Sequence, residues 1–170
     1  MTTTNDSLFC VVNACDKGLR LNKLPYYMYI CQIAGYDFSF NFRITSSGVH
    51  SKALIRYIEQ LENDDYIRQE DNMIKCTERG SNYLDSVVLS LDEIEFADWL
   101  TRIAYKLDVD DLKLLVITDL VLSEYMQDKK LETSKERIMN TVSVLCPSFT
   151  DKEFYTAIGL IQKIKEKNYE

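Results

Sequence analysis

The stretch SKALIRYIEQLENDDYIRQEDNMIKCTERG, residues 51–80, decides the fold. Its first part has four apolar residues at the spacing of an amphipathic helix: Leu54, Ile55, Ile58 and Leu61. Ser47 or Ser51 can cap the start of this helix. Two short runs, residues 66–69 and 73–76, then flank a polar tip, which predicts a β-hairpin. A helix followed directly by such a hairpin is typical of the recognition helix and wing of a winged-helix module.

Upstream of this stretch, the pattern predicts two helices and an extended segment. Residues 6–15 carry an apolar stripe, and residues 20–34 form a second helix that starts near Asn22, with Pro25 in its first turn and Gly35 after its end. The second helix is apolar nearly all round, so it should lie centrally. Residues 36–45 alternate between aromatic and polar side chains, as in a half-buried strand.

Downstream of the hairpin, Thr77 can cap a helix that ends near residue 89, and four more helices follow. Three of these begin at capping boxes, in which a hydroxyl residue is followed three positions later by glutamate: Ser90 with Glu93, Thr133 with Glu136 and Thr150 with Glu153. Asp108 begins the helix that ends near Gln127, and this helix should be the hub of the C-terminal lobe. The predicted fold is mainly α with a small β-hairpin, divided into a winged-helix-like lobe (residues 1–89) and a four-helix lobe (residues 90–170) within one continuous unit.

Composition narrows the functional class. The 170 residues carry a net charge of −7, which opposes general attraction to nucleic acid and favours a basic partner. No signal peptide or apolar membrane span is present, so a cytoplasmic location is expected. Five cysteines without a CxxC pair and a single histidine supply a zinc site poorly.

Two local patterns could be interpreted as catalytic or metal sites. His50 stands near Ser47 and Ser51, but no nucleophile-elbow motif accompanies it, and a turn or an interface is the better interpretation. Asp108, Asp110 and Asp111 could bind a hard cation, yet acidic residues are also expected where a helix begins. The sequence therefore predicts no catalytic residue and no metal ligand.

Basic residues on the predicted recognition helix and wing could contact DNA. They are Lys52, Arg56, Arg68, Lys75 and Arg79. The tip of the wing is acidic, however, and would repel the phosphate backbone.

Tyrosines favour a protein partner instead. The chain has 11 of them, concentrated in the first lobe, and tyrosine is enriched at interface hot spots. Tyr26, Tyr27, Tyr57 and His50 are the predicted partner-binding residues, whereas Trp99 should be buried where the C-terminal helices meet.

Several segments are similar to the YwgA-like and Panacea (SocA-type antitoxin) proteins. Residues 18–26, GLRLNKLPY, resemble the K-L-Q-K-L-x-Y entry of these proteins, and residues 76–80, CTERG, resemble their L-T-x-x-G wing exit. Residues 48–51 stand at their G-P-Y-S element, with Val49 and His50 in place of proline and tyrosine. A weaker likeness, in size and helical content, is to the small middle subunits of three-component SMC-like ATPase defence systems.

The resemblance implies a winged-helix-like fold, no cofactor, and a neutralising or accessory role in bacterial or phage conflict systems. The expected function is that of a non-catalytic, antitoxin-like regulatory subunit in antiviral defence. Its partner would be a protein encoded nearby: a toxin, an effector or an SMC-like ATPase. The alternative is a winged-helix DNA-binding regulator or a DNA-contacting accessory subunit.

Overall fold

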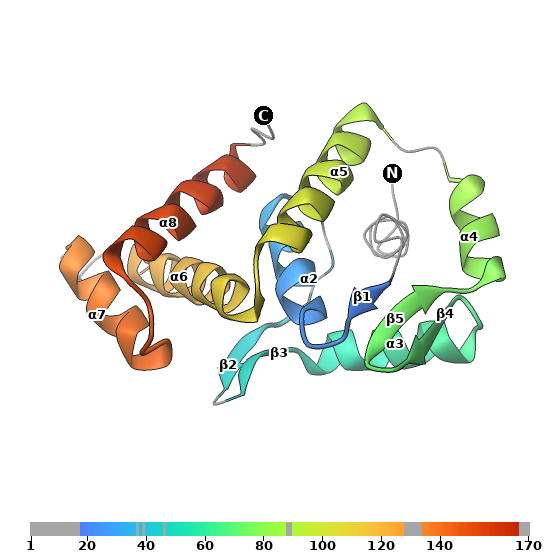
Figure 1. Ribbon diagram of the computed structural model, residues 1–170, viewed down its shortest axis with the longest axis horizontal. Helices are drawn as coiled ribbons and strands as arrows, with labels where there is room; N and C mark the ends of the chain where they lie inside the picture. Colours follow the sequence, from blue (N-terminus) through green and yellow to red (C-terminus); the bar gives the residue numbers. More distant parts are fainter. Residues whose placement is uncertain are drawn as a thin grey trace.

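The helix and hairpin predicted for residues 51–80 are present in the computed structural model of the chain (Figure 1). The structure describes residues 18–36, 38, 40–45, 47–87, 90–127 and 134–166, without the side chains of residues 103–105 and 127. The helix predicted at residues 6–15 lies outside the described residues.

The described part of the chain is mainly helical with little β-structure, as predicted. Its helices are α2 (Leu24–Ile33), α3 (Lys52–Asn63), α4 (Glu78–Asp85), α5 (Leu91–Lys106), α6 (Val109–Gln127), α7 (Lys135–Leu145) and α8 (Asp151–Lys165). Its strands are β1 (Leu19–Arg20), β2 (Arg43–Thr45), β3 (Gly48–His50), β4 (Ile67–Glu70) and β5 (Met73–Cys76).

The wing is a three-stranded antiparallel sheet in the order β1-β5-β4. Glu70 pairs with Met73, so β4 and β5 are joined by a two-residue loop, in which Asp71 and Asn72 both have positive φ. Positive φ at both positions is what a type I′ hairpin turn requires, and Asn and Asp tolerate it better than most residues. The order of α2, α3, β4, β5 and α4 matches the predicted winged-helix-like order of helix, recognition-like helix, hairpin and closing helix, whereas β1 was not predicted.

The start of the second helix differs from the prediction. Leu19 and Arg20 form β1 and pair with Ile74 and Met73 of β5, and the helix begins only at Leu24. Pairing with the edge of the wing gives these two residues backbone hydrogen bonds that a helix start would leave unmade. Among the described residues of the extended segment predicted at 36–45, only those of β2 form a strand.

A second hairpin, β2 with β3, separates α2 from α3. The sequence suggested only a turn where β3 lies. Gly48 begins β3 with φ +117°, and a Cβ at this position would collide with the hydroxyl of Tyr26. Glycine is therefore required both by the backbone conformation and by the close approach of α2.

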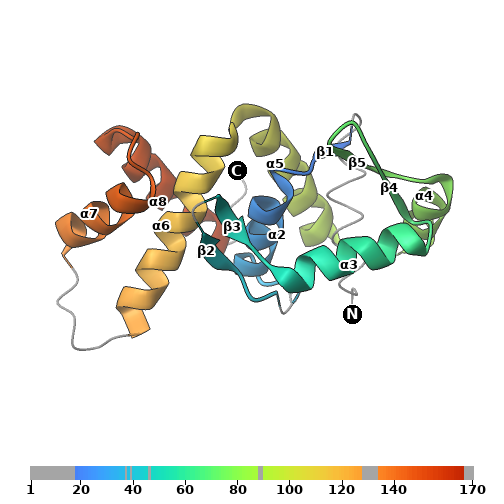
Figure 2. The same cartoon turned by 90° about the horizontal axis from the view of Figure 1, so that it is seen from below.

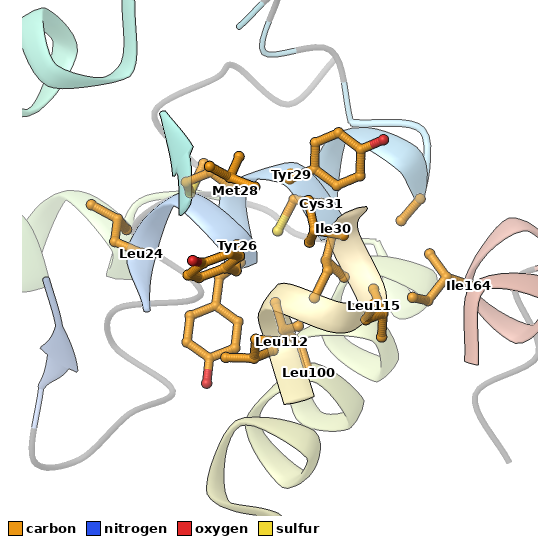
Figure 3. Close-up of a cluster of buried hydrophobic side chains, with 14 of the residues drawn as sticks. Leu24, Tyr26, Met28, Tyr29, Ile30, Cys31, Leu100, Leu112, Leu115 and Ile164 are labelled. Atoms are coloured by element: carbon orange, nitrogen blue, oxygen red, sulfur yellow. The ribbon is translucent and has the colours of Figure 1, made fainter. Parts of the chain in front are cut away.

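The predicted hub helix, α6, is central to the whole molecule. It packs against α2, α7, α8 and β3. Figure 3 shows Leu112 and Leu115 of α6 among side chains from α2, α5 and α8. The core cluster therefore joins residues from both predicted lobes, and the boundary at residues 89 and 90 stays a prediction.

Most predicted helix caps are confirmed. The hydroxyl of Ser51 accepts a hydrogen bond from the N–H of Leu54, so Ser51 and not Ser47 caps α3. Further predicted caps that the structure contains are Thr77, Ser90, Asp108 and Thr150. Thr133 lies outside the described residues, and Ser134 is the N-cap of α7, with its Oγ 3.3 Å from the nitrogen of Arg137.

A buried carboxylate ties three helices together. Asp119 of α6 is 1% exposed, and its Oδ2 accepts a hydrogen bond of 2.8 Å from the hydroxyl of Tyr29 on α2. The ammonium of Lys165 on α8 lies 2.6 Å from Oδ1. Oδ1 accepts no hydrogen bond of acceptable geometry from the described residues, so the contact with Lys165 is an ion pair without a hydrogen bond. α2, α6 and α8 are thus held by charge as well as by apolar packing.

Tyr29 should make part of the stability depend on pH. Burial raises its pKa, and the carboxylate of Asp119 raises it further. An unfolded tyrosine ionises near pH ~10, so this contribution is complete below that pH and is lost as pH rises toward the folded-state pKa. We expect the stability advantage of the wild type over Tyr29→Phe to narrow above pH ~10 in urea denaturation. A difference that stays constant across this range would contradict the prediction.

Candidate interaction surface

Two of the predicted partner-binding residues belong to the core. Tyr26 is 4% exposed and Tyr27 is 1% exposed, so neither side chain can form a contact surface. Their helix is enclosed by α6, α8 and β3, in keeping with its apolar sequence. Tyr57 is half-buried, with its ring 5.7 Å from that of Phe40, and His50 is exposed.

The predicted DNA-contacting residues of the wing are paired within the wing itself. Glu70 lies 3.3 Å from Arg68 and 3.6 Å from Lys75. The guanidinium of Arg79 lies over the ring of Tyr66, 4.8 Å from its centre. These exposed pairs are weak individually, but they place an acidic residue between the two cations that would approach a phosphate. The charges of Arg68 and Lys75 are therefore partly offset within the wing.

The recognition-like helix has its free cations near its start. Lys52 and Arg56 are exposed and four residues apart, so they lie on one face of α3. Ile55 stands beside them and is 45% exposed. Within the described part of the chain, neither cation forms an ion pair.

The β2–β3 hairpin adds two more cationic or titratable side chains next to this face. Arg43 is the cross-strand partner of His50, and both are exposed. Directly opposed residues of an antiparallel pair project to the same side. Figure 2 shows β3 running straight into α3, which places the hairpin beside the start of the helix. We name this group the α3 basic surface: Arg43, His50, Lys52, Ile55 and Arg56.

Charge along the chain marks the same region. Residues 38–58 contain three Lys or Arg and no Asp or Glu, which leaves 17 basic against 27 acidic side chains in the rest of the chain. Sequence reasoning identified His50, Lys52 and Arg56, but it assigned Arg43 only to the polar side of a strand and Ile55 only to the apolar stripe. The run without acidic residues was the signal that could have revealed the whole surface.

The start of α3 also opposes its own helix dipole. Each of α4, α5, α6, α7 and α8 has an acidic residue in its first turn, whereas α2 and α3 have none, and α3 begins with Lys52. A positive charge at a helix N-terminus is unfavourable because that end carries a partial positive charge. The first turn of α3 is therefore not optimised for stability.

The other candidate sites are structural. Oδ1 of Asp108 accepts hydrogen bonds from the backbone N–H groups of Asp110 and Asp111, as the capping interpretation predicts. A cavity of about 240 Å³ adjoins these residues, but Asp111 and Glu153 there also accept backbone hydrogen bonds. Across the described residues, no group of three His, Cys, Asp or Glu side chains could hold a metal ion.

The seryl groups near His50 have structural partners. The hydroxyl of Ser51 caps α3 and is buried, and that of Ser47 lies 3.0 Å from the hydroxyl of Thr45. Ser46 lies outside the described residues. His50 is on the exposed side of β3, so the structure does not bring it together with Ser51 as a nucleophile and base.

The comparisons with known proteins add no assignment. No protein-family model matches this chain, and no curated protein or solved structure gives a significant match. Among the helices that the structure describes, none is long and apolar enough to cross a membrane.

Proposed function

We propose that this chain is a non-catalytic, protein-binding regulatory subunit that uses the exposed face of its winged-helix-like region. The resemblance to the YwgA-like and Panacea proteins suggests that it acts in the cytoplasm, in a bacterial or phage conflict system. The partner would then be a toxin, an effector or an SMC-like ATPase encoded nearby.

The pairing inside the wing is the observation that carries this proposal. A winged helix that binds DNA needs unpaired cations on both its helix and its wing to neutralise phosphates. Here Glu70 is shared by Arg68 and Lys75, and Arg79 stacks on Tyr66. The second half of α3 also presents Glu59 and Glu62 to solvent, where a DNA groove would bring them close to phosphates. A protein surface accommodates such a mixture of charges more readily than a duplex does.

The order of β1, α2, α3, β4 and β5 keeps DNA binding as the second candidate, because Lys52 and Arg56 stand on the recognition-like helix. A salt titration of binding to duplex DNA separates the two. A DNA-binding protein should lose affinity steeply with salt, whereas we expect no binding even in dilute salt.

The direct test is co-purification from the native gene neighbourhood. We expect the tagged chain to retain the product of a neighbouring gene in a stable complex and to alter the activity or toxicity of that product. A chain that purifies alone and leaves its neighbours unaffected would contradict the proposal.

A further inference from the structure

We infer that the α3 basic surface docks an acidic segment of the partner protein. This inference rests on the proposed function and specifies its site and chemistry. The overall charge of the chain favours a basic partner, but the local charge does not. The three cations of residues 38–58 stand on β2 and on the first half of α3, and β3 leads directly into α3.

The cations of this surface are available to a partner. Arg43, Lys52 and Arg56 form no ion pair with any described residue, in contrast to Arg68, Lys75 and Lys165. An acidic partner would also relieve the unfavourable Lys52 charge at the start of α3. The charge of Lys52 lowers the stability of the free chain, so its neutralisation by a partner would contribute favourably to the free energy of binding.

The surface combines an exposed apolar side chain with its cations. Ile55, 45% exposed, lies next to Lys52 around the helix, on the side away from Arg56. Protein interfaces commonly combine an apolar anchor with charged neighbours, and an apolar side chain gives a DNA backbone nothing to bind. The partner segment should therefore combine acidic side chains with at least one apolar side chain.

The backbone under this surface is held in place. Ser51 caps α3 and is buried, and the side chain of Thr45 donates a hydrogen bond of 2.9 Å to the carbonyl oxygen of Gly48 across the hairpin. Val49, between Gly48 and His50, is anchored in the core. Little ordering of the backbone is then needed on binding, which favours affinity.

Charge reversal with a matched control tests the inference. The test variant is Lys52→Glu with Arg56→Glu. The control is Arg102→Glu with Lys152→Glu, which changes the net charge equally at exposed positions on α5 and α8. Each protein is purified in its native gene context and is also titrated with a fluorescent oligoglutamate peptide.

We expect the wild type and the control to retain the partner and to bind oligoglutamate, with the peptide competing against the partner. The test variant should bind both the partner and oligoglutamate at least about tenfold more weakly, as expected when two charges at an interface are reversed. Its melting temperature should not fall, because glutamate at position 52 suits the helix dipole. Lys52→Gln with Arg56→Gln, which introduces no new charge, should lie between the wild type and the test variant.

Three other results would overturn the inference. Retention of the partner by the test variant would place the docking site elsewhere and leave the proposed function intact. Absence of any partner in the wild type would remove the proposed function together with the inference. Tighter binding of duplex DNA than of oligoglutamate, dependent on Lys52 and Arg56, would assign the surface to nucleic acid.

Discussion

Replacing Trp99 with alanine should lower the free energy of unfolding by about 3 to 5 kcal/mol, the range for removing a large aromatic side chain from a core. Trp99 is 6% exposed, so its burial is confirmed, while its predicted place where the C-terminal helices meet stays a prediction. Its ring stacks on that of Phe96, with 6.0 Å between centres, and Phe96 in turn stacks on Tyr36 at 4.9 Å. The substitution would therefore open a cavity between α5 and the segment that follows α2.

Leu91→Ala on the same helix is the matched control, since Leu91 is 77% exposed. It should change stability by no more than about 0.5 kcal/mol, as surface substitutions usually do. Urea denaturation followed by circular dichroism measures both variants. A loss below about 1 kcal/mol for Trp99→Ala would mean that α5 does not pack as described. If that variant also lost its partner, the interface would belong on the C-terminal helices.

Lys165→Met should be the second costly substitution, by about 3 kcal/mol. This value is at the lower end of the range for breaking a buried ion pair, because the Lys165 side chain is 45% exposed and water can replace part of its effect. The substitution leaves the carboxylate of Asp119 buried with only the hydroxyl of Tyr29 as a described hydrogen-bond donor. An unpaired buried charge is more unfavourable than a lost surface pair.

A double-mutant cycle isolates the pair from the loss of the lysine stem. In the Asp119→Asn background no buried negative charge remains, so Lys165→Met should cost much less than in the wild type. Lys152→Met, an exposed lysine on the same helix, controls for removing a charge from α8. Equal effects of Lys165→Met in both backgrounds would mean that the ion pair contributes nothing to stability.

Most of the secondary structure could be predicted because its signals are local. Ser51 caps α3, Thr77 caps α4, and the Asp71-Asn72 turn closes the wing, and each depends on residues within a few positions. Where a partner distant in sequence decides the conformation, prediction was wrong. Arg20 was assigned to a helix, and with Leu19 it forms a strand only because β5, more than fifty residues later, provides hydrogen bonds.

The candidate surface was predicted in part for the same reason. Lys52 and Arg56 stand out as helix neighbours in any amphipathic pattern, but Arg43 joins them only through its pairing with His50 across the β2–β3 hairpin. Tyr26 and Tyr27 were assigned to a surface because tyrosine is common at interfaces. Their helix is apolar nearly all round, and this pattern already indicated burial.

The sequence by itself determined the order of the helices and the wing, because apolar periodicity, capping side chains and turn residues act over a few positions. It also determined the run of residues 38–58 without acidic side chains.

Only the tertiary structure decided which charges are neutralised. Asp119 meets Tyr29 and Lys165 because α2, which precedes α6 in the sequence, and α8, which follows it, both pack against α6. Glu70 meets Arg68 and Lys75 through the pairing of β4 with β5, while Lys52 and Arg56 keep their charges free. Side-chain pairing depends on distances of a few ångströms between separate elements, and chain packing sets those distances.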